Sequence, residues 1–219
     1  MAQPSPSYTV ALHLEVPASQ KAVTTLVDTA SATGAIVNGV DVADTDGDTL
    51  VVDLTADTRD SKHRAELVEA LGAIDGVVVH NVGDSTFMAH VGGKISTASK
   101  YPIHNRRDLA RVYTPGVARV CKAIYDHPER ARQLTIKKNT VAVVTDGTAV
   151  LGMGDIGPSA AMPVMEGKAV LFKQFGDVDA WPVALDTKDP EEIISIVKAI
   201  APAYGGINLE DIAAPKCFD

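Results

Sequence analysis

The chain has 219 residues, a formal net charge of −8, 46% hydrophobic residues and 22% charged residues; these globular values exclude a disordered or fibrous chain. No apolar run approaches the roughly 18 residues needed to cross a bilayer, and the first residues lack the cationic start and apolar core of a signal peptide. Two cysteines, Cys121 and Cys217, cannot form a disulfide framework, so we expect a cytoplasmic protein that does not enter a membrane.

Charge divides the chain into two parts. Residues 1–90 carry 4 basic and 13 acidic side chains, whereas residues 94–138 carry 11 basic and 3 acidic ones. This shift predicts two domains, 1–90 and 91–219. The basic stretch fits a solvated surface, a site for an anionic small molecule or a contact with an acidic partner. Because the chain as a whole is acidic, we expect no nucleic-acid partner.

The first domain shows strand and helix patterns in regular alternation. Apolar residues alternate with polar ones in the first run, as in a half-buried strand, and recur at helical spacing in the second. In chain order the pattern predicts a strand, a helix, two strands joined by an Asp-Gly turn, a helix and a strand, over residues 8–16, 17–34, 35–42, 48–54, 60–72 and 77–82. The order βαββαβ predicts a ferredoxin-like α+β sandwich.

This arrangement resembles the ACT domain, a small regulatory module of many metabolic enzymes. The resemblance implies a role in regulation or assembly, with a small-molecule effector as its ligand. ACT domains that bind amino acids typically carry Pro-Gly between the first strand and the first helix, and this chain has Pro17-Ala18 there. The scattered histidines of this domain are expected to be surface or hydrogen-bonded residues rather than metal ligands: His13, His63, His80 and His90.

The second domain begins with a Gly- and Ser-rich linker at about residues 92–99. The sequence Tyr113-Thr114-Pro115-Gly116 then predicts a type II turn, in which the glycine has a positive φ. A helix is expected to follow over residues 117–134. Held before a rigid turn, Tyr113 is a candidate proton donor, and the alternative is a tyrosine with a structural role only.

A glycine-rich run follows two predicted strands, at 140–145 and 147–151. Gly152-Met153-Gly154-Asp155-Ile156-Gly157 matches the GxGxxG dinucleotide fingerprint, and Asp177 and Asp179 lie about 20 residues beyond it. However, Pro158 and Pro163 are expected to interrupt the helix that this fingerprint requires. Dinucleotide binding by Gly152–Gly157 therefore remains an alternative interpretation.

Two further features lie among apolar residues. Lys168 either extends to the surface or is partly buried, where it can serve as a base near neutral pH. Glu210 and Asp211 follow an apolar run, as ligands do at the carboxyl ends of strands in α/β folds. All six histidines lie at or before His127, so these acids favour a hard cation, Mg²⁺ or Mn²⁺. The alternative is a pair of acids on a surface turn.

Together these features indicate a protein family more specifically than any one of them does alone. In chain order they comprise YTPGVA, VVTDGTAVLGMGDIGPSAAMPVMEGKAVLFKQF, VDAWPVALD and GGINLEDIAAP. In this order the residues from about Gly93 to Asp219 resemble the N-terminal domain of malic enzyme, an α/β substrate domain. The compact bacterial NAD(P)-dependent form is the most similar, here with an ACT domain in front.

The resemblance implies oxidative decarboxylation of (S)-malate to pyruvate and CO₂ with NAD or NADP and a Mg²⁺ or Mn²⁺ ion. The family's catalytic tyrosine and lysine fall on Tyr113 and Lys168. Two of its three metal-binding carboxylates fall on Glu210 and Asp211. It also implies that the glycine run builds the substrate domain and that the nicotinamide cofactor is bound by a separate domain.

The chain departs from the family in two places. In larger animal-type enzymes an arginine that holds the substrate carboxylate precedes the glycine run, and here that position is Ala149, so another group must neutralise the acid. The family's third metal-binding aspartate and its NAD-binding domain lie beyond the position of Asp219. We therefore expect a truncated malic enzyme that is inactive by itself.

Three hypotheses stand at this point. The first is the ACT domain plus the substrate and metal half of malic enzyme, binding malate. The second is a regulatory or assembly module without catalysis, and the third is a small dinucleotide-binding protein. We expect a homodimer or larger assembly, because a four-stranded ACT sheet has exposed edges, and Tyr113 is then available to a partner's site.

Overall fold

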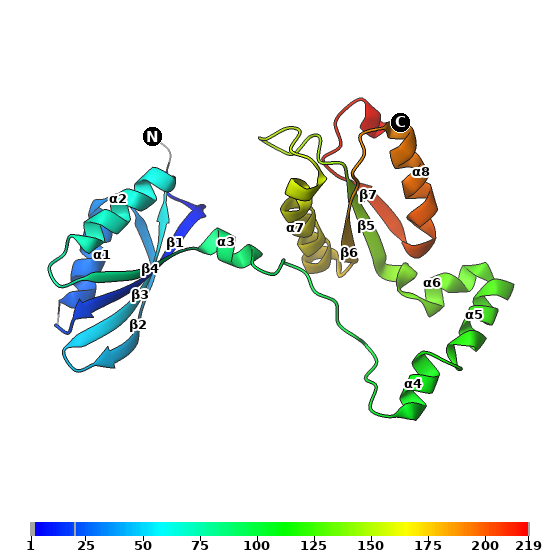
Figure 1. Ribbon diagram of the computed structural model, residues 1–219, viewed down its shortest axis with the longest axis horizontal. Helices are drawn as coiled ribbons and strands as arrows, with labels where there is room; N and C mark the ends of the chain where they lie inside the picture. Colours follow the sequence, from blue (N-terminus) through cyan, green and yellow to red (C-terminus); the bar gives the residue numbers. More distant parts are fainter. Residues whose placement is uncertain (1–2, 20, 219) are drawn as a thin grey trace. The chain divides into compact units, whose positions relative to one another are not determined.

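The computed structural model describes residues 3–19 and 21–218. They form two compact units, residues 1–91 and 92–219, and each is described by itself (Figure 1). Met1 and Ala2, which begin the stretch that we expect not to be a signal peptide, lie outside the described residues. In the part of the chain that is described, no helix is both long enough and apolar enough to cross a membrane.

The first unit contains a four-stranded antiparallel sheet of order β2-β3-β1-β4. Its elements are β1 (Ser5–Pro17), α1 (Ala22–Ala32), β2 (Ile36–Asp46), β3 (Thr49–Thr58), α2 (Ser61–Gly72), β4 (Val78–Asp84) and the short α3 (Ser85–His90). Up to β4 this is the βαββαβ order of a ferredoxin-like sandwich, so the predicted fold of this unit is confirmed.

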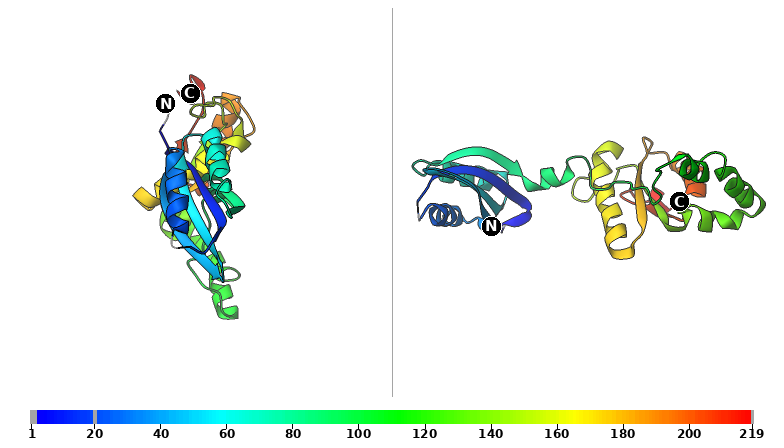
Figure 2. Two further views of the ribbon diagram at one scale, coloured as in Figure 1. Left: turned by 90° about the vertical axis from the view of Figure 1, so that its left-hand side faces the viewer. Right: turned by 90° about the horizontal axis from the view of Figure 1, so that it is seen from below.

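Alternation along the central strands creates the core of this unit. On β1, Leu12 and Leu14 are fully buried while His13 between them faces the opposite side of the sheet. Leu26 of α1 and Leu67 of α2 belong to the same buried cluster, so both helices cover one face of the sheet (Figure 2). Each such leucine contributes about 2 kcal/mol by leaving water.

The histidines of the first unit make hydrogen bonds, as expected. His63 is only 1% exposed; its Nδ1 accepts from the backbone N–H of Arg59 at 3.0 Å, so its Nε2 donates to the carbonyl of Thr33, also at 3.0 Å. His13 and His80 make hydrogen bonds on the surface, with Asp53 and Glu15 respectively. His90 makes a hydrogen bond with the carbonyl of Thr86 in its own helix, α3.

The second unit is built on a three-stranded parallel sheet of order β6-β5-β7. Its helices and strands are α4 (Arg106–Val112), α5 (Val117–Asp126), α6 (Ala131–Leu134), β5 (Thr140–Thr145), α7 (Pro158–Gly176), β6 (Asp179–Ala184), α8 (Pro190–Ile200) and β7 (Gly206–Leu209). Short 3₁₀ helices occupy Pro128–Arg130, Ile136–Asn139, Ala201–Ala203 and Lys216–Phe218.

Helices cover both faces of this sheet, as is usual for parallel strands. Ala142 and Val144 of β5 pack with Ile193 of α8 in one cluster. Val143 points to the opposite face, where α7 buries Met165 and further small side chains. Figure 1 shows α7 and α8 on opposite sides of the strands. The predicted α/β class of this unit is therefore confirmed.

Three predictions about helices and strands in this unit are wrong. The helix expected over 117–134 is broken after Asp126, because Pro128 lacks the N–H that would continue it. The strand expected over 147–151 is a loop in which only Val150 forms a bridge, with Gly154. Finally, α7 is not interrupted by its prolines: Pro158 occupies the first turn, where no N–H is needed, and the helix continues through Pro163.

The turn after Tyr113 also differs from its prediction. Gly116 has φ −62°, so this is not a type II turn with a positive φ at glycine, and the Thr114–Pro115 peptide is cis. Glycine is required for another reason. A Cβ at this position would lie 2.3 Å from the carbonyl oxygen of Ala110, so the two segments can approach each other only without a side chain.

Candidate functional site

The candidate site lies where strands of the second unit end. β5 and β7 are parallel neighbours, so their carboxyl ends share one edge of the sheet, the usual position of ligand sites in α/β folds. Glu210 and Asp211 follow β7 directly. The backbone N–H of Glu210 donates to the carbonyl of Val144 in β5 at 2.8 Å, which continues the strand pairing up to the first acid.

Lys168 and Glu210, which are far apart in sequence, meet in the structure. Lys168 lies in the middle of α7, and its Nζ is 3.1 Å from Oε1 of Glu210. The second oxygen of Glu210 accepts a hydrogen bond of 3.0 Å from the side-chain amide of Asn208. The Lys168 side chain is 34% exposed and that of Glu210 21% exposed. The lysine is therefore partly buried and ion-paired rather than extended into solvent.

Asp211 lies beside this pair in an unusual conformation. Its φ is +53°, in the left-handed region that few residues other than glycine adopt. Its Oδ2 is buried and finds no hydrogen-bond partner among the described residues. Burial and the neighbouring charge of Glu210 raise the pKa of Asp211, against the opposing effect of Lys168.

These two carboxylates fit a divalent hard cation. A buried carboxylate oxygen without a partner is costly, and a cation would supply the missing contact with oxygen ligands of the kind that Mg²⁺ and Mn²⁺ prefer. Within the described ranges, no group of three or more His, Cys, Asp or Glu side chains is arranged to hold a metal ion. The described chain therefore offers two adjacent acids to such a cation.

Tyr113 is not brought to this site. It follows α4, its side chain is 67% exposed, and among the described residues it makes no hydrogen bond with Lys168, Glu210 or Asp211. Figure 1 shows α4 and α5 extending away from the strands of the second unit. The structure thus assembles three of the four predicted site residues and leaves the tyrosine on an exposed surface.

The glycine-rich run forms a loop over residues 146–157 between β5 and α7. At its base, a Cβ on Gly147 would lie 2.2 Å from the carbonyl oxygen of Gly157, so the two ends of the loop close on each other. At its tip Leu151 is 94% exposed. A dinucleotide fingerprint instead turns tightly from strand to helix.

The acids proposed for that fingerprint lie elsewhere. Asp177 follows the carboxyl end of α7 and Asp179 begins β6, so both lie at the opposite end of the sheet from the loop. Both are paired with Lys173, at 2.5 and 3.0 Å. The structure therefore contradicts their predicted role beside the glycine run.

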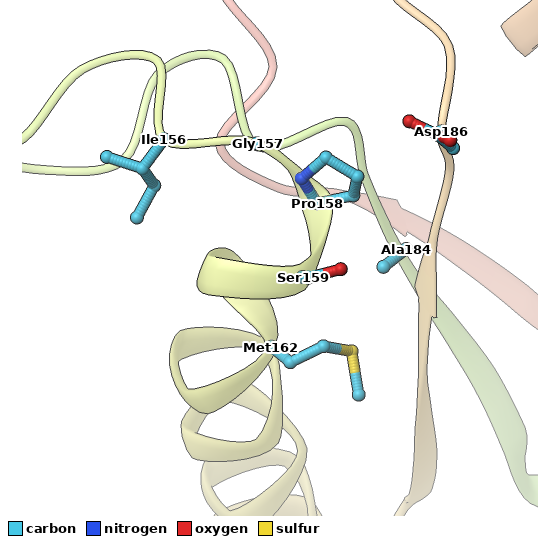
Figure 3. Close-up of a pocket in the computed structure, with 7 residues that line it drawn as sticks. All are labelled: Ile156, Gly157, Pro158, Ser159, Met162, Ala184 and Asp186. Atoms are coloured by element: carbon cyan, nitrogen blue, oxygen red, sulfur yellow. The ribbon is translucent and has the colours of Figure 1, made fainter.

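A pocket of about 400 Å³ opens between the start of α7 and the end of β6. Figure 3 shows the Ser159 hydroxyl and Asp186 on its two sides. Its lining comprises Ile156, Gly157, Pro158, Ser159, Met162, Ala184 and Asp186. Lys168, Glu210 and Asp211 do not line it, so it lies outside the candidate site.

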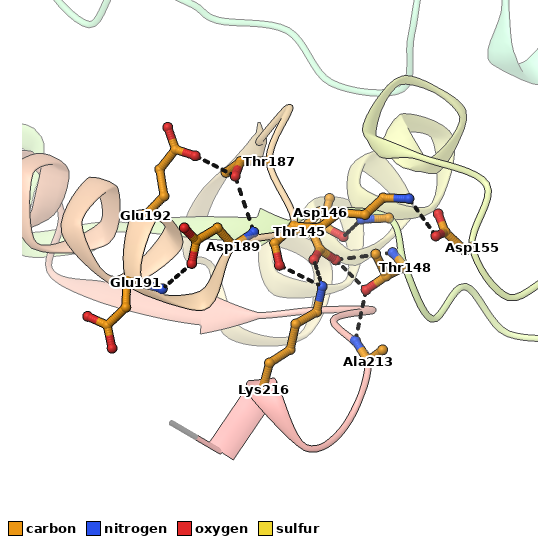
Figure 4. Close-up of polar contacts among 12 residues, drawn as sticks. Thr145, Asp146, Thr148, Asp155, Thr187, Asp189, Glu191, Glu192, Ala213 and Lys216 are labelled. Carbon is orange, nitrogen blue, oxygen red and sulfur yellow. Dashed lines mark hydrogen bonds and ion pairs between the residues drawn. The ribbon is translucent and has the colours of Figure 1, made fainter.

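A buried carboxylate that the sequence reasoning missed lies at the same sheet edge. Asp146 directly follows β5 and is 0% exposed, and its side chain accepts hydrogen bonds from Thr148 and Lys216 (Figure 4). An acid after an apolar strand was the signal that identified Glu210 and Asp211. The same signal, applied to residues 140–146, would have identified Asp146.

Comparisons with known proteins identify relatives of this chain. The family profile described as "Malic enzyme, N-terminal domain" matches residues 92–219. An NAD-dependent malic enzyme from Geobacillus stearothermophilus is 59% identical over 203 residues, which cover 91% of this chain and 42% of the relative. An NADP-dependent malic enzyme from Escherichia coli K12 is 50% identical over 128 residues, 58% of this chain and 17% of the relative.

Solved structures give the same result. The NAD-dependent malic enzyme from Thermotoga maritima has a TM-score of 0.60 and 53% identity, covering 62% of this chain and 39% of that one. Malic enzyme from Pyrococcus horikoshii Ot3 has a TM-score of 0.57 and 56% identity, covering 57% and 29%.

The chain spans about two fifths of the length of the Geobacillus relative. That alignment is longer than the second unit, so the similarity extends into the first unit as well. Because the profile of one domain family matches more than half of the sequence, this chain belongs to the malic enzyme family.

Proposed function

We propose that this chain carries the substrate-binding and metal-binding part of an enzyme that converts (S)-malate to pyruvate and CO₂ with NAD or NADP and a Mg²⁺ or Mn²⁺ ion. The contact between Lys168 and Glu210 is the observation that carries the proposal. This contact brings the amine of Lys168 next to Glu210, a carboxylate suited to a metal ion, at one edge of the sheet. The chain that contains it belongs to the malic enzyme family.

Glu210 and Asp211 would hold the cation. When bound, the cation would polarise the C2 oxygen of malate as a Lewis acid, and the nicotinamide would accept hydride from C2. Glu210 would exchange the ammonium of Lys168 for the cation as its partner. Lys168, released from this ion pair, would lose a proton to water, and its neutral Nζ could then accept the proton of the substrate hydroxyl.

Lys168 and Tyr113 would share the proton transfers. Nζ of Lys168 accepts the proton of the C2 hydroxyl as hydride leaves C2, so malate becomes a 2-keto acid. Loss of the carboxylate next to C3 as CO₂ leaves an enolate. The hydroxyl of Tyr113 donates a proton to C3 of this enolate and pyruvate is formed.

The first unit would serve regulation or assembly as an ACT-like domain with a small-molecule effector, in a cytoplasmic enzyme. Its topology supports this role. The exposed position of Tyr113 supports an assembly of at least two chains, in which the tyrosine reaches the site of a partner.

Turnover of malate tests the proposal in a protein that joins residues 1–219 to the cofactor-binding part of the Geobacillus relative. Formation of reduced nicotinamide is followed with saturating malate and Mn²⁺. We expect Lys168→Ala to lower kcat by about 10²- to 10⁴-fold and Tyr113→Phe to slow protonation of the enolate more than hydride transfer. Lys173→Ala, on the same helix but paired at the opposite sheet end, should leave kcat nearly unchanged.

The polypeptide of residues 1–219 alone serves as the comparison. Hydride transfer needs the nicotinamide about 3–3.5 Å from C2, and we expect no turnover from this polypeptide. Near-normal kcat for both Lys168→Ala and Tyr113→Phe would remove the acid–base assignment. Comparable turnover from the short polypeptide would place the dinucleotide site within these residues.

A further inference from the structure

Asp146 is a buried acid to which the proposed reaction gives no role. Its Oδ1 accepts from the backbone N–H of Thr148 at 3.1 Å and from the Thr148 hydroxyl at 2.6 Å. Its Oδ2 accepts from Nζ of Lys216. Among the described residues, the side-chain hydrogen-bond partners of Asp146 therefore belong either to the start of the glycine loop or to the segment that follows Asp211.

Three bonds join these two segments, which we call the 146–149 segment and the 211–216 segment. The N–H of Ala149 donates to the carbonyl of Asp211 at 2.9 Å. The N–H of Ala213 donates to the hydroxyl of Thr148, also at 2.9 Å. The ion pair between Lys216 and Asp146 is the third. In the 211–216 segment the three bonds attach at Asp211 itself and at two residues that follow it, and Figure 4 draws the bonds of Ala213 and Lys216.

Asp211 needs such support. A positive φ and a buried oxygen without a partner are both unfavourable, and residues of this kind persist only where their surroundings determine their conformation. Without the three bonds the 211–216 segment could relax, and Asp211 could rotate its carboxylate into water. The conformation that presents both acids together would then be lost.

We propose that Asp146, Thr148 and Lys216 are positioning residues that hold Asp211 in the conformation in which it binds the divalent cation. This inference rests on the proposed function of Glu210 and Asp211 as metal ligands. It adds three residues to the site, which would act through Asp211 and would not themselves bind the cation or the substrate. Groups that orient metal ligands typically change metal affinity by 10- to 100-fold when they are replaced.

The Asp146–Lys216 pair suits this role better than an apolar contact would. A carboxylate that accepts three hydrogen bonds has a defined direction, so it fixes both the loop and the following segment. The Lys216 ammonium also neutralises Asp146, so the support adds no net negative charge beside Glu210 and Asp211. Lys216 is 16% exposed, which keeps this pair largely out of water.

Amide hydrogen exchange of the metal-free 219-residue chain tests the support directly. Thr148→Val removes the acceptor of the Ala213 amide but leaves the charges unchanged. We expect the Ala213 amide to exchange faster in Thr148→Val than in the parent chain. The Ala149 amide bonds to Asp211 and not to the Thr148 side chain, but we expect it to exchange at least about 10-fold faster too, because the two segments are held together by the same set of bonds. Thr148→Ser keeps the hydroxyl and should exchange like the parent chain.

Mn²⁺ binding to the same chain gives the second measurement. We expect Thr148→Val and Lys216→Met to raise the Kd for Mn²⁺ about 10-fold or more, and Lys216→Arg to restore much of the affinity. Lys173→Met, which breaks an ion pair at the other end of the sheet, should change the Kd less than about twofold. Circular dichroism identifies variants that remain folded. If Lys216→Met does not fold, the Kd of Thr148→Val for Mn²⁺ tests the positioning role by itself.

The outcomes separate this inference from the proposed function. If Glu210→Gln does not weaken Mn²⁺ binding, the proposed metal site is wrong, and exchange of the Ala149 amide still tests the support. If Glu210→Gln abolishes binding but folded Thr148→Val and Lys216→Met bind Mn²⁺ like the parent chain, the positioning role is wrong. An unchanged Ala149 exchange rate in Thr148→Val would also overturn it.

Discussion

Asp211 illustrates how a single residue of the proposed metal site lowers the stability of the fold. Its backbone is left-handed and its Oδ2 is buried without a partner. Either property costs on the order of 1–3 kcal/mol. A chain optimised only for stability would not place an aspartate here, which agrees with its proposed use as a ligand.

We therefore expect Asp211→Asn to stabilise the metal-free chain while it removes Mn²⁺ binding. Asparagine tolerates a positive φ as aspartate does, so the gain comes from removing a charge that burial and Glu210 disfavour. Thermal unfolding with a chelator present should show a higher Tm than the parent chain. An equal or lower Tm would mean that the buried carboxylate is not a source of instability.

The charge of Asp146 has the opposite effect on stability. Burial alone would raise the pKa of Asp146, but hydrogen bonds from Lys216 and Thr148 outweigh it and hold the pKa below its usual value. The folded chain then binds this proton less readily than the unfolded chain. The ionised form stabilises the fold above the unfolded-state pKa of about 3.9, and this contribution is lost as the pH falls from there through the folded pKa.

We expect the free energy of unfolding of the parent chain to fall steeply below about pH 4. Asp146→Asn should be less stable at neutral pH and should show a shallower loss on acidification. Urea unfolding at a series of pH values from neutral to about 3 measures both. Parallel curves for the two proteins would show that Asp146 is not linked to acid unfolding.

Among the elements, those defined by a regular pattern were predictable. The strands and helices of the first unit follow from alternation and helical spacing, and the Asp-Gly turn at Gly47 joins β2 to β3 as predicted. The strand at 140–145 was also correct. The errors occurred where one residue decides the backbone: Pro128 ends a helix, whereas Pro163 is tolerated within α7.

The site was predictable only in part, for a similar reason. A strand followed by acids identified Glu210 and Asp211, but no local pattern shows that Lys168 of α7 lies 3.1 Å from Glu210. That distance depends on how α7 packs across the parallel sheet. The positions of Asn208, Thr148 and Lys216 depend on the same long-range arrangement.

The glycine loop between β5 and α7 is expected not to bind a dinucleotide. It extends from the sheet instead of turning tightly into the helix, and Asp177 and Asp179 are paired with Lys173 at the far end. Pro158 and Pro163 do not interrupt α7, so these prolines do not bear on dinucleotide binding. Calorimetry of the 219-residue chain should detect no binding at millimolar NAD or NADP. A micromolar site that Gly154→Val abolishes would contradict the prediction.

On the scale of the whole molecule, the segment around α4 and α5 suggests an assembly. Neither helix contains a buried residue, and the segment exposes several large apolar side chains: Leu109, Val112, Tyr113, Val120 and Tyr125. Apolar surface of this kind marks an interaction site more often than it remains in water. A second copy of the chain is the partner that we expect.

We therefore expect dimers or larger species in sedimentation velocity at tens of micromolar protein. Leu109→Glu with Val112→Glu should shift the distribution towards monomer, because charge at an apolar contact opposes association. Gln133→Glu, an exposed polar position on α6, is the matched control and should sediment like the parent. Monomer alone for the parent chain would count against self-association.

The bonds between the 146–149 and 211–216 segments limit how this chain can be recombined with its relatives. A hybrid joined anywhere between residues 150 and 210 inherits Asp146 and Thr148 from one parent and Lys216 from the other. Unless both parents carry compatible residues at positions 146, 148 and 216, such a hybrid contains a buried acid without the lysine that neutralises it. A junction in the irregular residues 92–105, by contrast, transfers all the partners of Asp211 together, so functional exchange among relatives should be concentrated there.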